Sequence, residues 1–209
     1  MPDIEKRFYP VADTVELRQD GDERVLTWVS PPYDRWSPIR GDMQEMIARD
    51  AFADSTDDVI ATVEHDNSKI FARVSAGTLK IEDRDDGAHH EARLGDRSYE
   101  RDLVTSIERG EITGASFEFV TLKDEWEKHE RDDGSTIFRR KVLKARRLQG
   151  GPVAQPFYDG GQVALRSLEG WRAAHEDIVM PGLASRWYQM HLEQRRRQME
   201  SGLGSCCNP

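Results

Sequence analysis

The sequence predicts a mainly β protein, a barrel or sandwich of short strands decorated by a few helices. Three observations support this prediction. Most segments before about residue 167 are short and alternate apolar with polar residues. Turn residues such as Asp-Gly pairs separate these segments, and only one stretch among them has strong helical spacing. Seven or so strands with few helices are typical of an all-β barrel or sandwich.

The strands are expected in a regular series along the chain. The segments 15–18 and 24–29 flank Gln19-Asp20-Gly21-Asp22, and an Asp-Gly pair between two alternating segments is a strong hairpin signal. Further strands are expected at 59–65, 70–74, 78–81, 88–94, 112–122 and 136–148. The charged stretch 123–128 is expected to connect the last two of these strands over the surface.

Three segments are expected to be helical. Residues 98–110 carry an apolar stripe at helical spacing, with Ser98 as a plausible N-cap and Gly110 placed to end the helix. Residues 43–52 are expected to form a short helix, and residues 182–199 a surface or partner-docking helix. The composition changes after about residue 165, so we expect one domain over 1–167 and a C-terminal extension over 168–209 that is partly helical or disordered.

Composition excludes several classes of function. The 209 residues include 30 basic and 39 acidic side chains, for a net charge of -9, which disfavours binding to a polyanion such as nucleic acid. No apolar leader and no run of 18 apolar residues occurs, so we expect neither membrane insertion nor secretion by a standard signal. The two cysteines, Cys206 and Cys207, are adjacent and support neither a disulfide framework nor a zinc ribbon.

Cofactor chemistry is also disfavoured. The six histidines show no metal-ligand spacing such as HExxH, and the chain has no glycine-rich phosphate loop. We therefore expect no metal and no cofactor, which leaves chemistry carried by side chains alone.

Ser116 and His65 form a candidate nucleophile and base. Alternation along 114–119 directs the Ser116 hydroxyl away from Phe117 and Phe119, and His65 ends an apolar strand between two acidic residues. A serine hydroxyl becomes a useful nucleophile when an imidazole accepts its proton. Both residue types also serve structural roles in strands, so the pair alone defines a candidate site and not an activity.

Six segments, in order and spacing, resemble the prohead maturation proteases of tailed bacteriophages, relatives in fold of the herpesvirus assemblins. The resemblance runs from about Phe52 to Ser167, rather more than half of the chain. The matching segments are Ala51-Phe52, Glu64-His65-Asp66, Gly77-Thr78-Leu79, Ser98 to Leu103, Gly114-Ala115-Ser116-Phe117-Glu118-Phe119, and Pro152-Val153 continuing through Pro156 and Tyr158 to Val163–Ser167.

This resemblance implies a herpesvirus-protease-like β-barrel surrounded by helices, with Ser116 as nucleophile and His65 as general base of a serine endopeptidase. The family's substrates are the scaffolding segment of the major capsid protein and often the protease itself. The implied location is the immature capsid inside the cytoplasm of the bacterial host. The oligomeric state stays open, with a homodimer as one option.

The sequence departs from the family pattern at the third catalytic position. Family members carry an acidic residue, an aliphatic residue and a serine before the Pro-Val step, where this chain has Gln149, Gly150 and Gly151. A glutamine can orient an imidazole but brings no charge, and in a well-studied serine protease the corresponding carboxylate-to-amide change lowers the rate about 10⁴-fold.

Three alternatives follow from this departure. The enzyme is slow with Gln149 as the third member, another carboxylate serves in its place, or the chain is an inactive homologue that acts as an internal scaffold. The candidate carboxylates are Glu64, Asp66 and Glu118. The glycines after Gln149 form either a β-bulge or turn, which is the favoured interpretation, or an oxyanion hole.

Overall fold

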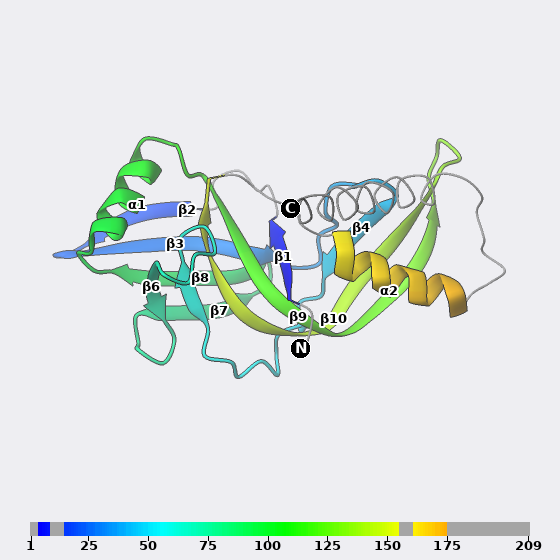
Figure 1. Ribbon diagram of the computed structural model, residues 1–209, viewed down its shortest axis with the longest axis horizontal. Coiled ribbons are helices and arrows are strands. Elements are labelled where there is room, and N and C mark those ends of the chain that lie inside the picture. Colours follow the sequence, from blue (N-terminus) through cyan, green and yellow to red (C-terminus); the bar gives the residue numbers. More distant parts are fainter. Residues whose placement is uncertain (1–3, 9–14, 155–160, 175–209) are drawn as a thin grey trace, which may run out of the picture. The chain divides into compact units, whose positions relative to one another are not determined.

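The computed structural model describes residues 4–8, 15–154 and 161–174 (Figure 1). Its contacts divide the chain into two units, Met1–Leu168 and Glu169–Pro209. Every residue of the candidate site lies in the first unit. No described helix is long and apolar enough to cross a membrane.

The first unit contains two β-sheets. The six-stranded sheet has the order β1-β9-β10-β5-β6, with β4 paired to β10 as well, and the four-stranded sheet has the order β2-β3-β8-β7. The strands of the first sheet are β1 (Glu5–Phe8), β4 (Met43–Ile47), β5 (Ile60–Thr62), β6 (Ile70–Arg73), β9 (Gly114–Glu130) and β10 (Thr136–Val153). Those of the second are β2 (Val15–Asp20), β3 (Glu23–Pro32), β7 (Leu79–Arg84) and β8 (Gly87–Leu94).

The mainly β class with few helices is confirmed, but the closed barrel is not found among the described residues. The pairings of the first sheet end at β1 and β6, and those of the second end at β2 and β7. β9 and β10 form a long hairpin that dominates Figure 1, and the two strands pair with each other in the first sheet from Glu130 and Thr136 to Gly114 and Val153. Both sheets therefore stay open over the part of the chain that the structure describes.

Most of the expected elements are confirmed. β2 and β3 form the hairpin around Gly21, whose φ of 62° is the left-handed conformation that this turn requires. β6 and β8 match their expected ranges within one residue, and β7 continues to Arg84, beyond its expected end at residue 81. α1 (Ser98–Glu108) is the expected helix, beginning within one residue of the predicted cap.

The expected helix at residues 43–52 is wrong, because residues 43–47 form strand β4, parallel to β10. Burial alternates along it, with Met43, Glu45 and Ile47 buried. A strand was hard to predict here because one of its three inward positions is a carboxylate, which breaks the apolar alternation that identifies a strand.

The expected surface connection at residues 123–128 is also wrong. These residues continue strand β9, which pairs with β10 as far as Glu130 and Thr136. Their side chains are mostly exposed, so the segment lacks the apolar alternation from which a strand is predicted. The second described helix, α2 (Gly161–Ala174), begins the C-terminal region, and the helix expected at 182–199 lies outside the described residues.

The packing of β9 fixes which of its side chains face the site. Phe117 and Phe119 are buried in a hydrophobic cluster together with Ile47, Phe52 and Val142. Alternation along the strand therefore turns Ser116 and Glu118 to the opposite face.

Candidate active site

Ser116 and His65 meet across the sheet, although 51 residues separate them in sequence. The Oγ atom of Ser116 on β9 lies 2.7 Å from Nε2 of His65. This distance is within hydrogen-bond range, which is the geometry that a nucleophile and its general base require. The structure therefore brings together the two residues that the sequence analysis selected, while their catalytic roles stay a prediction.

His65 is held by a turn that directly follows β5. Glu64 and His65 have φ angles of 55° and 56°, the left-handed region that costs a non-glycine residue about 1 kcal/mol or more. Two contacts hold this turn against the end of β10: the Glu64 N–H donates to the Pro152 carbonyl at 3.1 Å, and the Ala154 N–H donates to the Glu64 side chain. The strained turn is thus fixed at the place where it presents the imidazole to Ser116.

The close approach of β5 to β10 requires glycine at position 151. A Cβ atom built on Gly151 would lie 2.0 Å from the carbonyl oxygen of Thr62, the last residue of β5. Gly151 also pairs with Ser116 across the β9–β10 ladder, and a register shift lies between Arg147 and Gln149. The bulge in β10 therefore lies just before Gly150 and Gly151. The two glycines themselves are paired with β9 residues in the regular ladder.

The carboxylate behind the imidazole is that of Glu118. Its Oε1 atom lies 3.4 Å from Nδ1 of His65, on the side of the ring away from Ser116. Glu118 is buried, and it shares a face of β9 with Ser116 because the two are separated by one residue. Nδ1 and Oε1 do not form a hydrogen bond of good geometry with each other, so the contact is loose, as catalytic contacts often are without substrate.

Gln149, which we expected to orient the imidazole, contacts Glu118 instead. Its Nε2 atom donates to Oε2 of Glu118 at 2.5 Å, and its Oε1 atom accepts from the Thr62 hydroxyl at 2.9 Å. The physical reason is register: Gln149 is paired with Glu118 across the β9–β10 ladder, so the carboxylate stands between Gln149 and the histidine. The three side chains Thr62, Gln149 and Glu118 form a polar chain that crosses β5, β10 and β9.

The other two carboxylates considered have separate partners. Asp66 accepts from the backbone and the hydroxyl of Ser68 and pairs with Lys69, and Glu64 anchors the turn through Ala154. Of the three carboxylates considered, Glu118 is therefore the one that faces Nδ1.

Sequence reasoning missed two residues of β1 at the site. The Nζ atom of Lys6 lies 2.5 Å from Oε1 of Glu118, and the backbone carbonyl of Arg7 accepts a hydrogen bond from the Ser116 hydroxyl at 2.9 Å. β1 reaches these positions because it pairs antiparallel with β9, with Phe8 opposite Ser116. Four residues with three charges give no strong strand signal, so nothing in the pattern marked them.

Burial sets the protonation state of the base. It lowers the pKa of His65 below its usual value, because burial disfavours the charged ring; Lys6 lowers this pKa further, and the Glu118 carboxylate opposes both effects. His65 is therefore neutral at neutral pH and able to accept the Ser116 proton. The carboxylate can then stabilise the imidazolium that forms.

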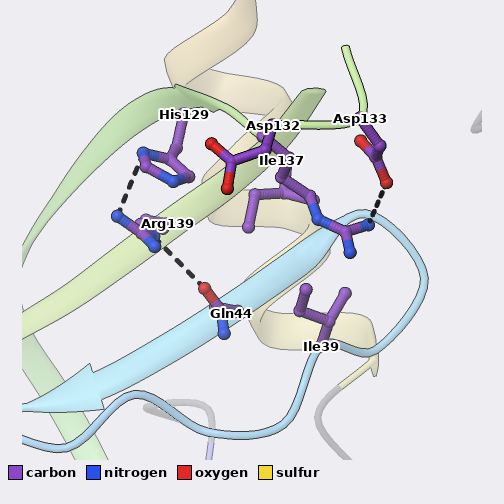
Figure 2. A pocket seen from close by; sticks show the side chains of 8 residues that line it. Ile39, Gln44, His129, Asp132, Asp133, Ile137 and Arg139 are labelled. Carbon is purple, nitrogen blue, oxygen red and sulfur yellow. Dashed lines mark hydrogen bonds and ion pairs between the residues drawn. The ribbon is translucent and has the colours of Figure 1, made fainter. Parts of the chain in front are cut away.

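Two hollows in the described part of the chain have linings that include neither Ser116 nor His65. One of about 330 Å³ lies at the turn of the β9–β10 hairpin and next to β4 (Figure 2). Its Arg139 donates to Gln44 and contacts His129, and its Arg131 pairs with Asp133. The polar side chains of this hollow therefore bind one another. Among all the described residues, no cluster of His, Cys, Asp and Glu is suited to a metal.

The site is that of a candidate serine hydrolase. A buried serine contacts one nitrogen of a neutral histidine, and a carboxylate lies beside the other nitrogen, on a mainly β fold. The family model described as caudovirus prohead serine protease matches residues 14–173. The chain therefore belongs to the caudovirus prohead serine protease family.

The structure of the bacteriophage T4 capsid assembly protease is similar to this chain with a TM-score of 0.41 and 11% identity, over 71% of this chain and 98% of that one. No curated protein matches the chain.

Proposed function

We propose that this protein is a serine endopeptidase that cleaves the scaffolding segment of a phage major capsid protein during prohead maturation. The observation that carries the proposal is the 2.7 Å contact between Ser116 Oγ and His65 Nε2, with Glu118 behind the ring. We assign this activity to residues 1–167, which contain all three side chains. Family membership supports the choice of a capsid-maturation substrate.

In the proposed mechanism, Ser116 Oγ attacks the carbonyl carbon of the scissile peptide bond while His65 Nε2 accepts the hydroxyl proton. The Glu118 carboxylate stabilises the imidazolium across Nδ1. When the tetrahedral intermediate collapses, the peptide C–N bond breaks and Nε2 returns the proton to the leaving amine. Water then hydrolyses the acyl-enzyme at Ser116 with His65 again acting as base.

A carboxylate beside Nδ1 favours an active enzyme over the inactive scaffold. The argument for inactivity was an uncharged amide at the third position, and this argument weakens when Gln149 supports Glu118 instead of replacing it. We therefore assign the third role to Glu118 and a positioning role to Gln149. The corresponding site of action is the immature capsid inside the host cytoplasm, where protease and substrate are concentrated together.

Co-expression with the major capsid protein tests this function. Intact-mass spectrometry of both chains should show discrete fragments for the wild type that disappear in Ser116→Ala. Ser106→Ala, on α1 and away from the site, is the control and should cleave as the wild type does. If the wild-type protein leaves the capsid protein uncut, and Ser116→Ala gives the same yield of assembled shells as the wild type, the result would support the internal-scaffold alternative.

A further inference from the structure

Strand β1 covers the edge of β9 at the proposed nucleophile. It pairs antiparallel with β9 from Glu5 opposite Phe119 to Phe8 opposite Ser116. Ser116 is only 3% exposed. A peptide that adds a strand to a sheet edge forms this kind of pairing, so β1 lies where a substrate strand would pair with β9.

Three successive side chains of β1 each meet an opposite charge on the rest of the protein. Glu5 pairs with Arg140 on β10 at 2.6 Å, Lys6 pairs with Glu118 at 2.5 Å, and Arg7 pairs with Glu45 on β4 at 2.6 Å. Glu5 and Arg7 are buried, whereas the Lys6 side chain is 46% exposed. The charges along this edge therefore complement an acidic residue followed by two basic ones, because a strand shifted by one position would place like charges together.

The contact between β1 and the nucleophile is unreactive. The Ser116 hydroxyl donates to the carbonyl oxygen of Arg7, so the proton that His65 would accept is engaged elsewhere. Attack requires the Oγ atom to face the carbonyl carbon, with the oxygen directed to hydrogen-bond donors. Lys6 also draws on the Glu118 oxygen that faces His65 Nδ1.

The buried charges are arranged so that β1 can leave. Glu5 and Arg7 pair with each other at 2.5 Å on β1, and Glu45 and Arg140 pair with each other at 2.8 Å on the sheet. Separation therefore leaves Glu5 beside Arg7 on β1 and Arg140 beside Glu45 on the sheet, while Glu118 loses Lys6 and keeps its hydrogen bond from Gln149. The match to the family begins after β1, at residue 14.

We propose that the β9 edge beside Ser116 is a binding site for a peptide strand with an acidic-basic-basic triplet, filled at rest by residues 5–8 of the chain itself. Its consequence for catalysis rests on the proposed function: the segment must leave before a substrate reaches Ser116. The strand site itself does not depend on catalysis and can be tested by binding alone.

The binding test uses a fluorescein-labelled peptide that copies residues 3–9, Asp-Ile-Glu-Lys-Arg-Phe-Tyr, and full-length protein in the Ser116→Ala background. Lys6→Glu with Arg7→Glu reverses two of the three charge pairs and should release β1. Fluorescence anisotropy should then show binding at least about tenfold tighter than to the Ser116→Ala protein alone, since a larger fraction of sites is open. A peptide with the triplet changed to Lys-Glu-Glu should not bind.

Equal affinity with and without the β1 changes, or equal binding of both peptides, would overturn the strand site. Circular dichroism at the working temperature checks that the double variant is folded. Lys6→Glu alone is the milder variant, since its side chain is half exposed, and should change the affinity in the same direction.

The catalytic consequence is measured by the rate at which a fluorophosphonate probe labels Ser116, forming an Oγ–P bond and releasing fluoride. Release of β1 should raise this rate about tenfold over the wild type, and adding the copied peptide should lower it again. Lys144→Glu is the matched control, because Lys144 has a similar exposure and also pairs with a carboxylate, Asp54, away from the site.

The two arms separate the two proposals. Rapid labelling of the wild type and the released variant alike would support the nucleophile and overturn the resting role of β1. Specific peptide binding without labelling of any variant would support the strand site and overturn the proposed peptidase.

Discussion

The side-chain amide of Gln149 donates to the Glu118 carboxylate, with 2.5 Å between Nε2 and Oε2. Glu118 in turn lies beside His65 Nδ1, so the glutamine acts on the imidazole through the carboxylate. An amide is suited to this place because it can donate a hydrogen bond without adding charge.

Gln149→Glu should therefore lower activity, although it restores the acidic residue that the family pattern has at this position. Two carboxylates would face each other in a buried site, and one of them would take up a proton or displace the other. We expect a rate at least about tenfold below the wild type at pH 7, with partial recovery in Gln149→Asn if its shorter amide still reaches Glu118. A gain of activity in Gln149→Glu would instead make position 149 the third catalytic member.

Glu118→Gln tests the assigned third member directly. The change keeps the shape of the side chain but removes the charge that stabilises the imidazolium, so we expect a loss of about 10³- to 10⁴-fold in kcat/KM. Glu127→Gln, an exposed position on the same strand, is the matched control and should leave the rate unchanged. Similar rates in both variants would remove Glu118 from the mechanism.

Much of this site could be predicted from the sequence, and the remainder shows what pattern reasoning lacks. Alternation around Ser116 predicted that its hydroxyl points away from Phe117 and Phe119, and this is confirmed because the two rings pack in a hydrophobic cluster while the hydroxyl faces His65. The same alternation puts Glu118 on the face of Ser116, yet the residues alone could not decide between it and Gln149. That choice depends on the β9–β10 register, which is shifted between Arg147 and Gln149.

Strands stabilised by buried charge were the hardest part of the fold to predict. β1 and β4 carry Glu5, Arg7 and Glu45, which are buried because they pair with one another and with Arg140. Hydrophobic periodicity has no means of identifying such strands, since their inward positions are polar. The expectation of a helix at 43–52 and the absence of any expectation for β1 have this common cause.

The pH profile of the wild type should have its acidic limb below pH 6.5. His65 must be neutral to act as base, and burial lowers its pKa, so activity is lost only when the pH falls through that lowered value. Lys6→Ala removes a positive charge near the ring and should move the limb toward higher pH. The midpoint of kcat/KM against pH measures this shift separately from any change in the plateau, and an unmoved midpoint would contradict the coupling.

Gly151→Ala should destabilise the protein and displace His65. The new Cβ atom would meet the Thr62 carbonyl oxygen at 2.0 Å, so β5 and the turn that follows it must move away from β10. We expect the free energy of unfolding to fall by about 3 kcal/mol or more. Because His65 is displaced, the probe should label Ser116 only slowly. Gly150→Ala is the comparison, since its Cβ would meet its nearest neighbour, the Ser116 carbonyl oxygen, at 3.3 Å and should cost much less.

His90 should make the fold sensitive to mild acid, independently of the active site. Its ring is buried and stacked on Trp28 with 4.7 Å between ring centroids, and burial, with Arg147 adding to it, lowers its pKa to about 3. The unfolded chain binds a proton here near pH 6.5 and the folded protein does not, so stability falls as the pH drops from about 6.5 toward 3. Between pH 7 and pH 5 this group alone should reduce the free energy of unfolding by about 2 kcal/mol. Urea unfolding of the wild type and of His90→Phe at both pH values measures this difference in stability, because phenylalanine keeps the stacking and cannot take up the proton. An equal pH dependence in the two proteins would show that His90 is not the cause.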